Sequence, residues 1–276
     1  MKRAVTVASI QMVSGECVKQ NLLKAEQLIA RAAEQGAAFV VLPEYFCLIS
    51  ADPKAKLAIK ESVGSGLIQD TLSQIAKKYQ IWLAGGSIPL DIGITDKVTN
   101  SLMLYAPDGT LYSRYDKVHL FSIHTEQMVH DEGQTMVAGN QVVTVDLPFG
   151  RVGLAICYDI RFPQFLAAMG DIDILLLPAA FTYQTGRSHW ELLLRARAID
   201  NQCFVVASAQ GGLHQSGRQT WGHSMIVDPW ANILGCLPEG EGVVIATLNL
   251  SEVAQVRQSL PVVRDRKQVK FQSQVE

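Results

Sequence analysis

Three ionisable side chains follow segments that are expected to form strands, and their types suit nucleophilic and acid–base catalysis. Cys157 stands where the apolar run 151–156 stops and a helix is expected to start. Backbone N–H groups and a helix N-terminus at such a position would lower the pKa of the thiol and donate hydrogen bonds to an oxyanion. An isolated cysteine is more often a small buried apolar residue, which is how we interpret Cys203 and Cys236. Cys157 differs because other strand ends also carry ionisable groups.

Glu44 and Lys117 are those other groups. Glu44 directly follows Val40-Val41-Leu42-Pro43, and Lys117 follows the expected strand 111–115. A carboxylate at the end of a buried strand costs free energy, so we expect it to be paired or to take part in the chemistry of a site. Desolvation would raise its pKa toward neutrality, as a general base requires. The sequence therefore favours a site that combines a thiol, a carboxylate and an ammonium.

Two other chemistries compete for these residues. A Cys–His pair would also activate a thiol, but no histidine stands in a context that ties it to Cys157. His124 and His130, with Asp131 and Glu132 nearby, offer metal-ligand types, but the i,i+4 histidine spacing of zinc peptidases is absent. We therefore expect neither a metal ion nor a cofactor.

The elements that must position these side chains alternate between short β-rich runs and amphipathic helices, which is typical of a layered α/β domain. Hairpins mixed with strand–helix–strand units favour a mixed sheet, or two stacked sheets with helices outside. The expected strands are 5–11, 39–42, 81–84, 100–105, 111–115, 142–147, 151–156, 174–177, 204–209, 224–227, 233–236 and 243–248. The expected helices are 18–35, 67–79, 162–169 and 189–201.

Composition limits the class of protein. The chain has 276 residues, of which 48% are hydrophobic and 18% charged, and its formal net charge is −2. Such a chain is too apolar to be disordered, and its charge lacks the basic excess of a nucleic-acid or membrane-surface binder. No apolar run approaches the roughly 18 residues that span a bilayer.

No linker or repeat divides the chain, so we expect a single domain over residues 1–276. The tail 261–276 contains little that could pack alone and is expected to lie across a partner subunit or to be disordered. The five cysteines are scattered and contain no CxxC pair, which argues against a disulfide framework. The first apolar run is too short for a secretory signal and is not followed by a cleavage site. We therefore expect a cytoplasmic location.

Three segments resemble the signature blocks of the nitrilase superfamily of carbon–nitrogen hydrolases. They are Leu42-Pro43-Glu44, the run YDKVHLF at 115–121 and the run GLAICYDIRFP at 153–163, and they occur in the order of the family. The resemblance extends from residue 5 to about residue 261. It implies a four-layer α-β-β-α sandwich with mixed sheets, which forms a homodimer or a higher homo-oligomer.

The resemblance also implies roles for individual residues. Glu44 would be the general base and acid, Lys117 the oxyanion stabiliser and Cys157 the nucleophile. Glu132, seven residues before Gly139, would be a supporting glutamate.

The chain departs from the family at three nearby positions. Gly133 stands where the family usually has serine, Ala138 where it has proline, and Ser122 where aspartate is common. These differences lie in a substrate-shaping loop, so they concern specificity more than reaction type.

The runs at 189–199 and 222–230 resemble the deaminated glutathione amidase branch of the superfamily. The reaction implied is hydrolysis of deaminated glutathione to 2-oxoglutarate and cysteinylglycine. An α-keto carboxylate needs a cation, and Arg161, four residues after Cys157, is our candidate. Thr185 is a further candidate for lining the pocket. An ω-amidase acting on 2-oxoglutaramate, or another small-amide or nitrile hydrolase, remains the nearest alternative.

A different class would be a redox protein. In that case peroxide would oxidise Cys157 to a sulfenic acid, and no amide would be hydrolysed.

Overall fold

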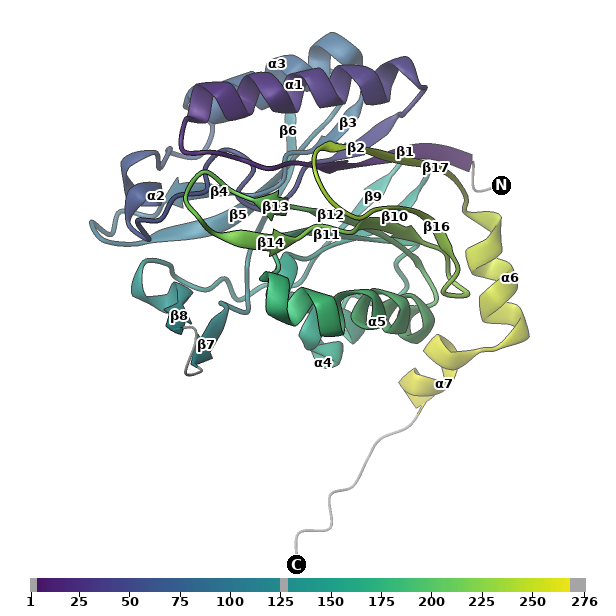
Figure 1. The fold of residues 1–276 in the computed structure, drawn as a ribbon. Coiled ribbons are helices and arrows are strands. Elements are labelled where there is room, and N and C mark those ends of the chain that lie inside the picture. Colours follow the sequence, from purple (N-terminus) through teal and green to yellow (C-terminus); the bar gives the residue numbers. More distant parts are fainter. Residues whose placement is uncertain (1–3, 125–128, 269–276) are drawn as a thin grey trace, which may run out of the picture.

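Two mixed β-sheets lie face to face, and helices cover the outer face of each (Figure 1). The computed structural model describes residues 4–124 and 129–268. The strand order is β17-β1-β2-β3-β5-β4 in the first sheet, with β6 also paired to β5, and β16-β15-β12-β11-β10-β9 in the second. Helices α1 and α3 lie on one side of the molecule, and α4 and α5 lie on the other. The structure thus confirms the expected α-β-β-α sandwich.

The strands of the first sheet are β1 (Ala4–Gln11), β2 (Phe39–Val41), β3 (Trp82–Ala84), β4 (Ile88–Asp91), β5 (Val98–Tyr105), β6 (Leu111–Asp116) and β17 (Gly242–Asn249). The strands of the second are β9 (Val143–Leu147), β10 (Gly150–Leu154), β11 (Ile174–Ala179), β12 (Phe204–Ala209), β15 (Ser224–Val227) and β16 (Ile233–Leu237). Two further pairs are β7 (Ser122–His124) with β8 (Val129–Asp131), and β13 (Gly211–Leu213) with β14 (Gln219–Trp221).

The helices are α1 (Val18–Glu34), α2 (Ala55–Ala58), α3 (Leu67–Tyr79), α4 (Pro163–Ala167), α5 (Tyr183–Asn201), α6 (Ser251–Ser259) and α7 (Val262–Gln268). Two 3₁₀ turns carry site residues, η1 (Glu132–Gln134) and η2 (Cys157–Arg161). None of the helices in the described ranges is both long enough and apolar enough to cross a membrane.

The apolar residues of the first sheet alternate between two cores, as strand geometry requires. Val7 and Val41 belong to the cluster that fills the space between the sheets and continues beneath α5. Ala8 and Val40, one residue along each strand, belong to the cluster beneath α1 and α3. Strand β2 is therefore buried on both faces, which explains its continuous apolar sequence.

Buried hydroxyl groups join the two sheets directly. Ser9 Oγ donates to the carbonyl oxygen of Ala207 at 2.7 Å, and Ser208 Oγ donates to the carbonyl oxygen of Val41 at 2.9 Å. These bonds fix the end of β2 against β12. As a result, the segments that follow the parallel strands β2, β10 and β11 can meet at one edge of the sandwich.

The expected elements agree with most of the structure, with three instructive differences. Strand β10 ends at Leu154, before Cys157, because the chain turns into η2. Helix α5 begins six residues earlier than expected, because Thr182 caps it by accepting a hydrogen bond from the backbone N–H of Thr185 at 3.3 Å. The assignment of Cys236 to the core is wrong: it lies exposed on β16, an edge strand.

The start of the C-terminal tail packs on its own chain. Val263 is buried, and its backbone N–H donates to Gln202 Oε1 at 3.2 Å, next to the C-terminus of α5. Arg266 donates to the carbonyl oxygen of Asp200 at 3.2 Å. Residues 269–276 lie outside the described residues.

Candidate active site

Glu44 lies at the junction of the two sheets and accepts hydrogen bonds on both carboxylate oxygens. Oε1 accepts from Asn100 Nδ2 at 2.9 Å and from Lys117 Nζ at 2.8 Å. Oε2 accepts from the backbone N–H of Ala180, directly after β11, at 2.9 Å. The side chain is only 1% exposed. The carboxylate is therefore held rigidly by groups from both sheets.

Lys117 directly follows β6 and lies between two carboxylates. Its Nζ is 2.8 Å from Glu44 Oε1 and 2.9 Å from Glu132 Oε2. Burial opposes its charge, but Glu132 and Glu44 outweigh that effect and raise the pKa of Lys117 above its usual range. The side chain is thus an ammonium ion at neutral pH and can stabilise a developing oxyanion.

Glu132 lies in η1 and anchors this ammonium from the other side. Its carboxylate also accepts from the Tyr45 hydroxyl at 2.6 Å and from the backbone N–H of Phe121 at 2.8 Å. Burial opposes ionisation, but Lys117 and these donors lower the pKa of Glu132 to about 2. The neighbouring Asp131 is exposed and caps η1 instead. The structure places Glu132, and not Asp131, beside Lys117.

Cys157 is the first residue of η2 and has a left-handed backbone with φ of 48°. Few non-glycine residues adopt that conformation, which is concentrated at functional sites. Burial raises the pKa of its thiol, and the charge and hydrogen bond of Glu44 raise it further, while Lys117 opposes them. The expectation of a lowered thiol pKa is therefore wrong for the resting site. The Glu44 carboxylate therefore acts directly on the Cys157 thiol and favours its protonated form.

Asp159 holds the turn that carries Cys157, and sequence reasoning did not single it out. Its buried carboxylate accepts from the backbone N–H of Ile156 at 2.9 Å and from the Tyr115 hydroxyl at 2.7 Å. It also accepts from the backbone N–H of His119 at 3.0 Å and lies 2.8 Å from His119 Nδ1. Asp159 thereby ties η2 to the segment that carries Lys117.

Asn100 was also missed as a site residue. It is a buried amide in β5, between Thr99 and Ser101, and a buried polar side chain usually has a specific partner. Its side-chain amide donates to Glu44, and its backbone carbonyl oxygen accepts from the backbone N–H of Lys117 at 2.9 Å. One residue thus positions the carboxylate and the ammonium relative to each other.

The structure gives the histidines other partners. His119 contacts Asp159, His189 contacts Arg161, and His214 contacts Ser14 and Thr220. Within the described part of the chain no histidine hydrogen-bonds to Cys157, and no cluster of metal-ligating side chains is found. The nearest titratable partners of the thiol are Glu44 and Lys117.

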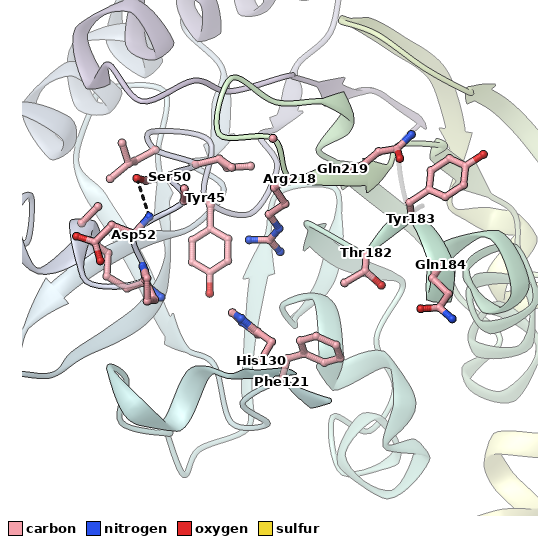
Figure 2. A pocket seen from close by; sticks show the side chains of 17 residues that line it. Tyr45, Ser50, Asp52, Phe121, His130, Thr182, Tyr183, Gln184, Arg218 and Gln219 are labelled. Atoms are coloured by element: carbon pink, nitrogen blue, oxygen red, sulfur yellow. Dashed lines mark hydrogen bonds between the residues drawn. The ribbon is translucent and has the colours of Figure 1, made fainter. Parts of the chain in front are cut away.

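A small pocket opens onto Cys157. It is lined by Arg161 and Thr185, and it shares Phe121 and Thr182 with a larger cleft of about 660 Å³. Figure 2 shows Tyr45 and Arg218 reaching into this cleft toward His130 and Phe121. The structure therefore places both predicted substrate-binding residues in the pocket that Cys157 lines. Their role stays a prediction.

Two of the positions that depart from the family pattern, Ser122 and Gly133, lie near Glu132, and neither lines the two pockets described above. Ser122 is exposed and pairs with Asp131 across the β7–β8 hairpin, beside Phe121. Gly133, in η1, accepts a hydrogen bond from Lys97 Nζ on its carbonyl oxygen at 2.7 Å. These residues adjoin the supporting Glu132 but do not contact Cys157 directly, which fits an effect on specificity.

We predict opposite effects of Glu44→Gln and Lys117→Met on the pKa of Cys157. Removing the carboxylate charge should lower that pKa, and removing the ammonium should raise it. The pH dependence of iodoacetamide labelling, followed by mass spectrometry of the Cys157 peptide, measures both. The exposed Cys236 serves as the internal reference. Shifts in the same direction would contradict this electrostatic arrangement.

We predict that Glu132→Gln destabilises the protein in a pH-dependent manner. Breaking a buried ion pair costs about 3–5 kcal/mol. Because the pKa of Glu132 is lowered from 4.5 to about 2, its ionisation stabilises the fold above pH 4.5, and that contribution is lost as the pH falls toward 2. The difference in free energy of unfolding between wild type and variant should therefore shrink over this range in urea titrations. A constant difference would disprove the assignment.

Comparison with known proteins identifies the family of this chain. A family model for carbon–nitrogen hydrolases matches residues 6–258. A deaminated glutathione amidase from Synechocystis is 40% identical over 266 residues, which cover 94% of this chain and 97% of that protein. A human omega-amidase is 36% identical and covers 95% of this chain and 94% of its own length.

A solved structure has the same fold. Nit3 of Saccharomyces cerevisiae, a member of branch 10 of the nitrilase superfamily, is 32% identical and superposes with a TM-score of 0.86 over 96% of this chain and 97% of that chain. The fold, the three sequence blocks and the family match agree. The chain therefore belongs to the carbon–nitrogen hydrolase family and is a hydrolase of carbon–nitrogen bonds other than peptide bonds.

Proposed function

We propose that this protein is an amidase that hydrolyses deaminated glutathione, an α-keto acid amide, to 2-oxoglutarate and cysteinylglycine. Cys157 would act as the nucleophile, with Glu44 as base and acid and Lys117 as oxyanion stabiliser. The observation that carries the proposal is the buried Glu44 carboxylate, which bonds Lys117 at 2.8 Å and faces the Cys157 thiol. The Synechocystis relative named for this activity supports the choice of substrate.

In the first half of the reaction, Glu44 accepts the thiol proton and the Cys157 sulfur attacks the amide carbon. The charge that develops on the carbonyl oxygen is stabilised by Lys117 and by the backbone N–H of Tyr158. Protonated Glu44 then gives its proton to the leaving amine, and the carbon–nitrogen bond breaks. The acid half of the substrate remains on Cys157 as a thioester.

In the second half, water replaces the amine. Glu44 removes a proton from the water, and the resulting hydroxide attacks the thioester carbon. Collapse of the second tetrahedral intermediate releases 2-oxoglutarate, and the proton returns to the Cys157 sulfur. A high thiol pKa suits this cycle, because the proton must move between Glu44 and sulfur in both directions.

The pocket next to Cys157 offers a cation to the keto-acid half of the substrate. Arg161 lines it, and the Arg161 guanidinium lies 5.2 Å from the centre of the Phe181 ring. Its other polar contact among the described residues is His189 Nδ1 at 3.3 Å, so the guanidinium can still bind a carboxylate. Thr185 lines the same pocket and bonds Thr182 at 2.8 Å.

The second candidate is an ω-amidase acting on 2-oxoglutaramate, which the human omega-amidase relative favours. That substrate has the same keto-acid half but releases ammonia. A redox function for Cys157 is less well supported, because the family match and the relatives named for amidase activity point to hydrolysis of carbon–nitrogen bonds. We further propose that the enzyme is a cytoplasmic homodimer.

We predict that the wild-type protein releases 2-oxoglutarate from deaminated glutathione faster than from 2-oxoglutaramate, and that Cys157→Ala abolishes release from both. Coupled glutamate dehydrogenase assays measure the product. Lys117→Met should lower kcat by at least roughly 10²–10³, the effect of losing one oxyanion donor.

Preference for 2-oxoglutaramate would move the protein to the ω-amidases. Turnover by Cys157→Ala would refute the proposed mechanism. Arg187 is exposed on α5 and lines neither pocket, so the Arg187→Met variant controls for nonspecific effects of a substitution on activity.

A further inference from the structure

The larger cleft carries two cations that the reaction described above does not use. Lys56, on α2, and Arg218, just before β14, both line it. Asp52 also lines the cleft, and one of its oxygens is occupied by the backbone N–H of Lys54 at 2.8 Å. The cleft is therefore more basic than a chain with a net charge of −2 would suggest.

Lys56 is half-buried over the ring of Tyr45, with its Nζ 5.6 Å from the ring centre. Within the described part of the chain it has no ion-pair partner. Burial lowers its pKa, and the nearby charge of Arg218 lowers it further, against the opposing effect of Glu132. Such a lysine would gain from a bound anion.

Arg218 is anchored on one side only. Its Nη2 donates to the carbonyl oxygen of Ala180 at 3.2 Å, and no carboxylate of the described residues pairs with it. Figure 2 shows its guanidinium pointing into the cleft between Tyr45 and Thr182. His130, opposite, is kept neutral because burial and Arg218 lower its pKa. The free edge of the guanidinium is thus available to a ligand.

The position of these cations relative to Cys157 assigns them to one half of the substrate. The larger cleft shares Phe121 and Thr182 with the pocket at Cys157, so the two spaces adjoin. Arg161 lines only the nucleophile pocket. An amide bound with its acid half beside Arg161 would therefore extend its amine half into the larger cleft.

We infer that Lys56 and Arg218 form an anion-binding subsite for the carboxylate of a peptide-like leaving amine. For deaminated glutathione this group is the glycine carboxylate. The inference rests on the proposed amidase function and deepens it. It gives a physical basis for discrimination, because 2-oxoglutaramate releases ammonia and leaves the subsite empty.

The test compares kcat/KM for the two substrates in wild type, Lys56→Met and Arg218→Lys. Lys56→Met removes one charge without touching Ala180, and should lower the ratio of deaminated glutathione to 2-oxoglutaramate activity by roughly 10- to 100-fold, mainly through KM. Arg218→Lys keeps the charge and should lower the ratio less. The control Arg187→Met makes the same change in net charge outside the cleft and should leave the ratio unchanged.

A second substrate makes the test independent of folding defects. Deaminated glutathione with its glycine carboxylate converted to an amide should be a poorer substrate for wild type by a similar factor. The Lys56→Met variant should hydrolyse this amide and the free acid with nearly equal kcat/KM. If wild type hydrolyses both equally well, or if Lys56→Met lowers the activity on all substrates in proportion, the subsite does not exist.

Failure of the proposed function would be recognised separately. If wild type hydrolyses neither substrate, the subsite is tested by binding alone, with cysteinylglycine and its C-terminal amide titrated into Cys157→Ala protein and followed by NMR. Weaker binding of the amide, and loss of that difference in the Lys56→Met, Cys157→Ala double variant, would support the subsite. Equal binding of both ligands would overturn it.

Discussion

The buried ammonium of Lys117 is the interaction on which the rest of the site depends. An isolated charge in the interior would be prohibitively costly, so Lys117 requires the carboxylates of Glu44 and Glu132 within 3 Å. In turn the ammonium compensates the negative charge of Glu44, so that this carboxylate can lie beside the Cys157 thiol. Glu132 is the second carboxylate on this ammonium, and a hydrogen bond from the Tyr45 hydroxyl holds it in place. The site therefore behaves as one electrostatic unit.

The stacked sheets make this unit possible. Glu44 follows a strand of the first sheet, whereas Cys157 and Ala180 follow strands of the second, and the Ser208–Val41 bond fixes the sheets against each other. Each site residue lies just beyond a strand end, where the backbone is free to turn and the rigid sheet still sets its position. This placement requires a left-handed backbone conformation at Cys157, which costs conformational free energy. The larger cleft is lined by residues of α2 and by the first residues of α5.

Much of this was predictable from sequence, for physical reasons. Apolar alternation and turn residues predicted most strands, and the exact bounds of α3 follow from its amphipathic pattern. Glu44, Lys117 and Cys157 stand out because ionisable groups rarely end apolar strands. Asn100 and the raised thiol pKa depend on which groups face each other after folding, and local patterns do not contain that information. Helix α5 starts early because Thr182 caps it, and Cys236 is exposed because it lies on an edge strand. Neither fact can be derived from local sequence patterns.

The most direct test of the central claim is identification of the covalent intermediate. Wild-type protein mixed with deaminated glutathione and quenched in acid during turnover should carry a 2-oxoglutaryl group on Cys157, detected by peptide mass spectrometry. The adduct should disappear once the substrate is exhausted. An adduct on another residue, or steady release of 2-oxoglutarate by a protein lacking the Cys157 thiol, would contradict the account.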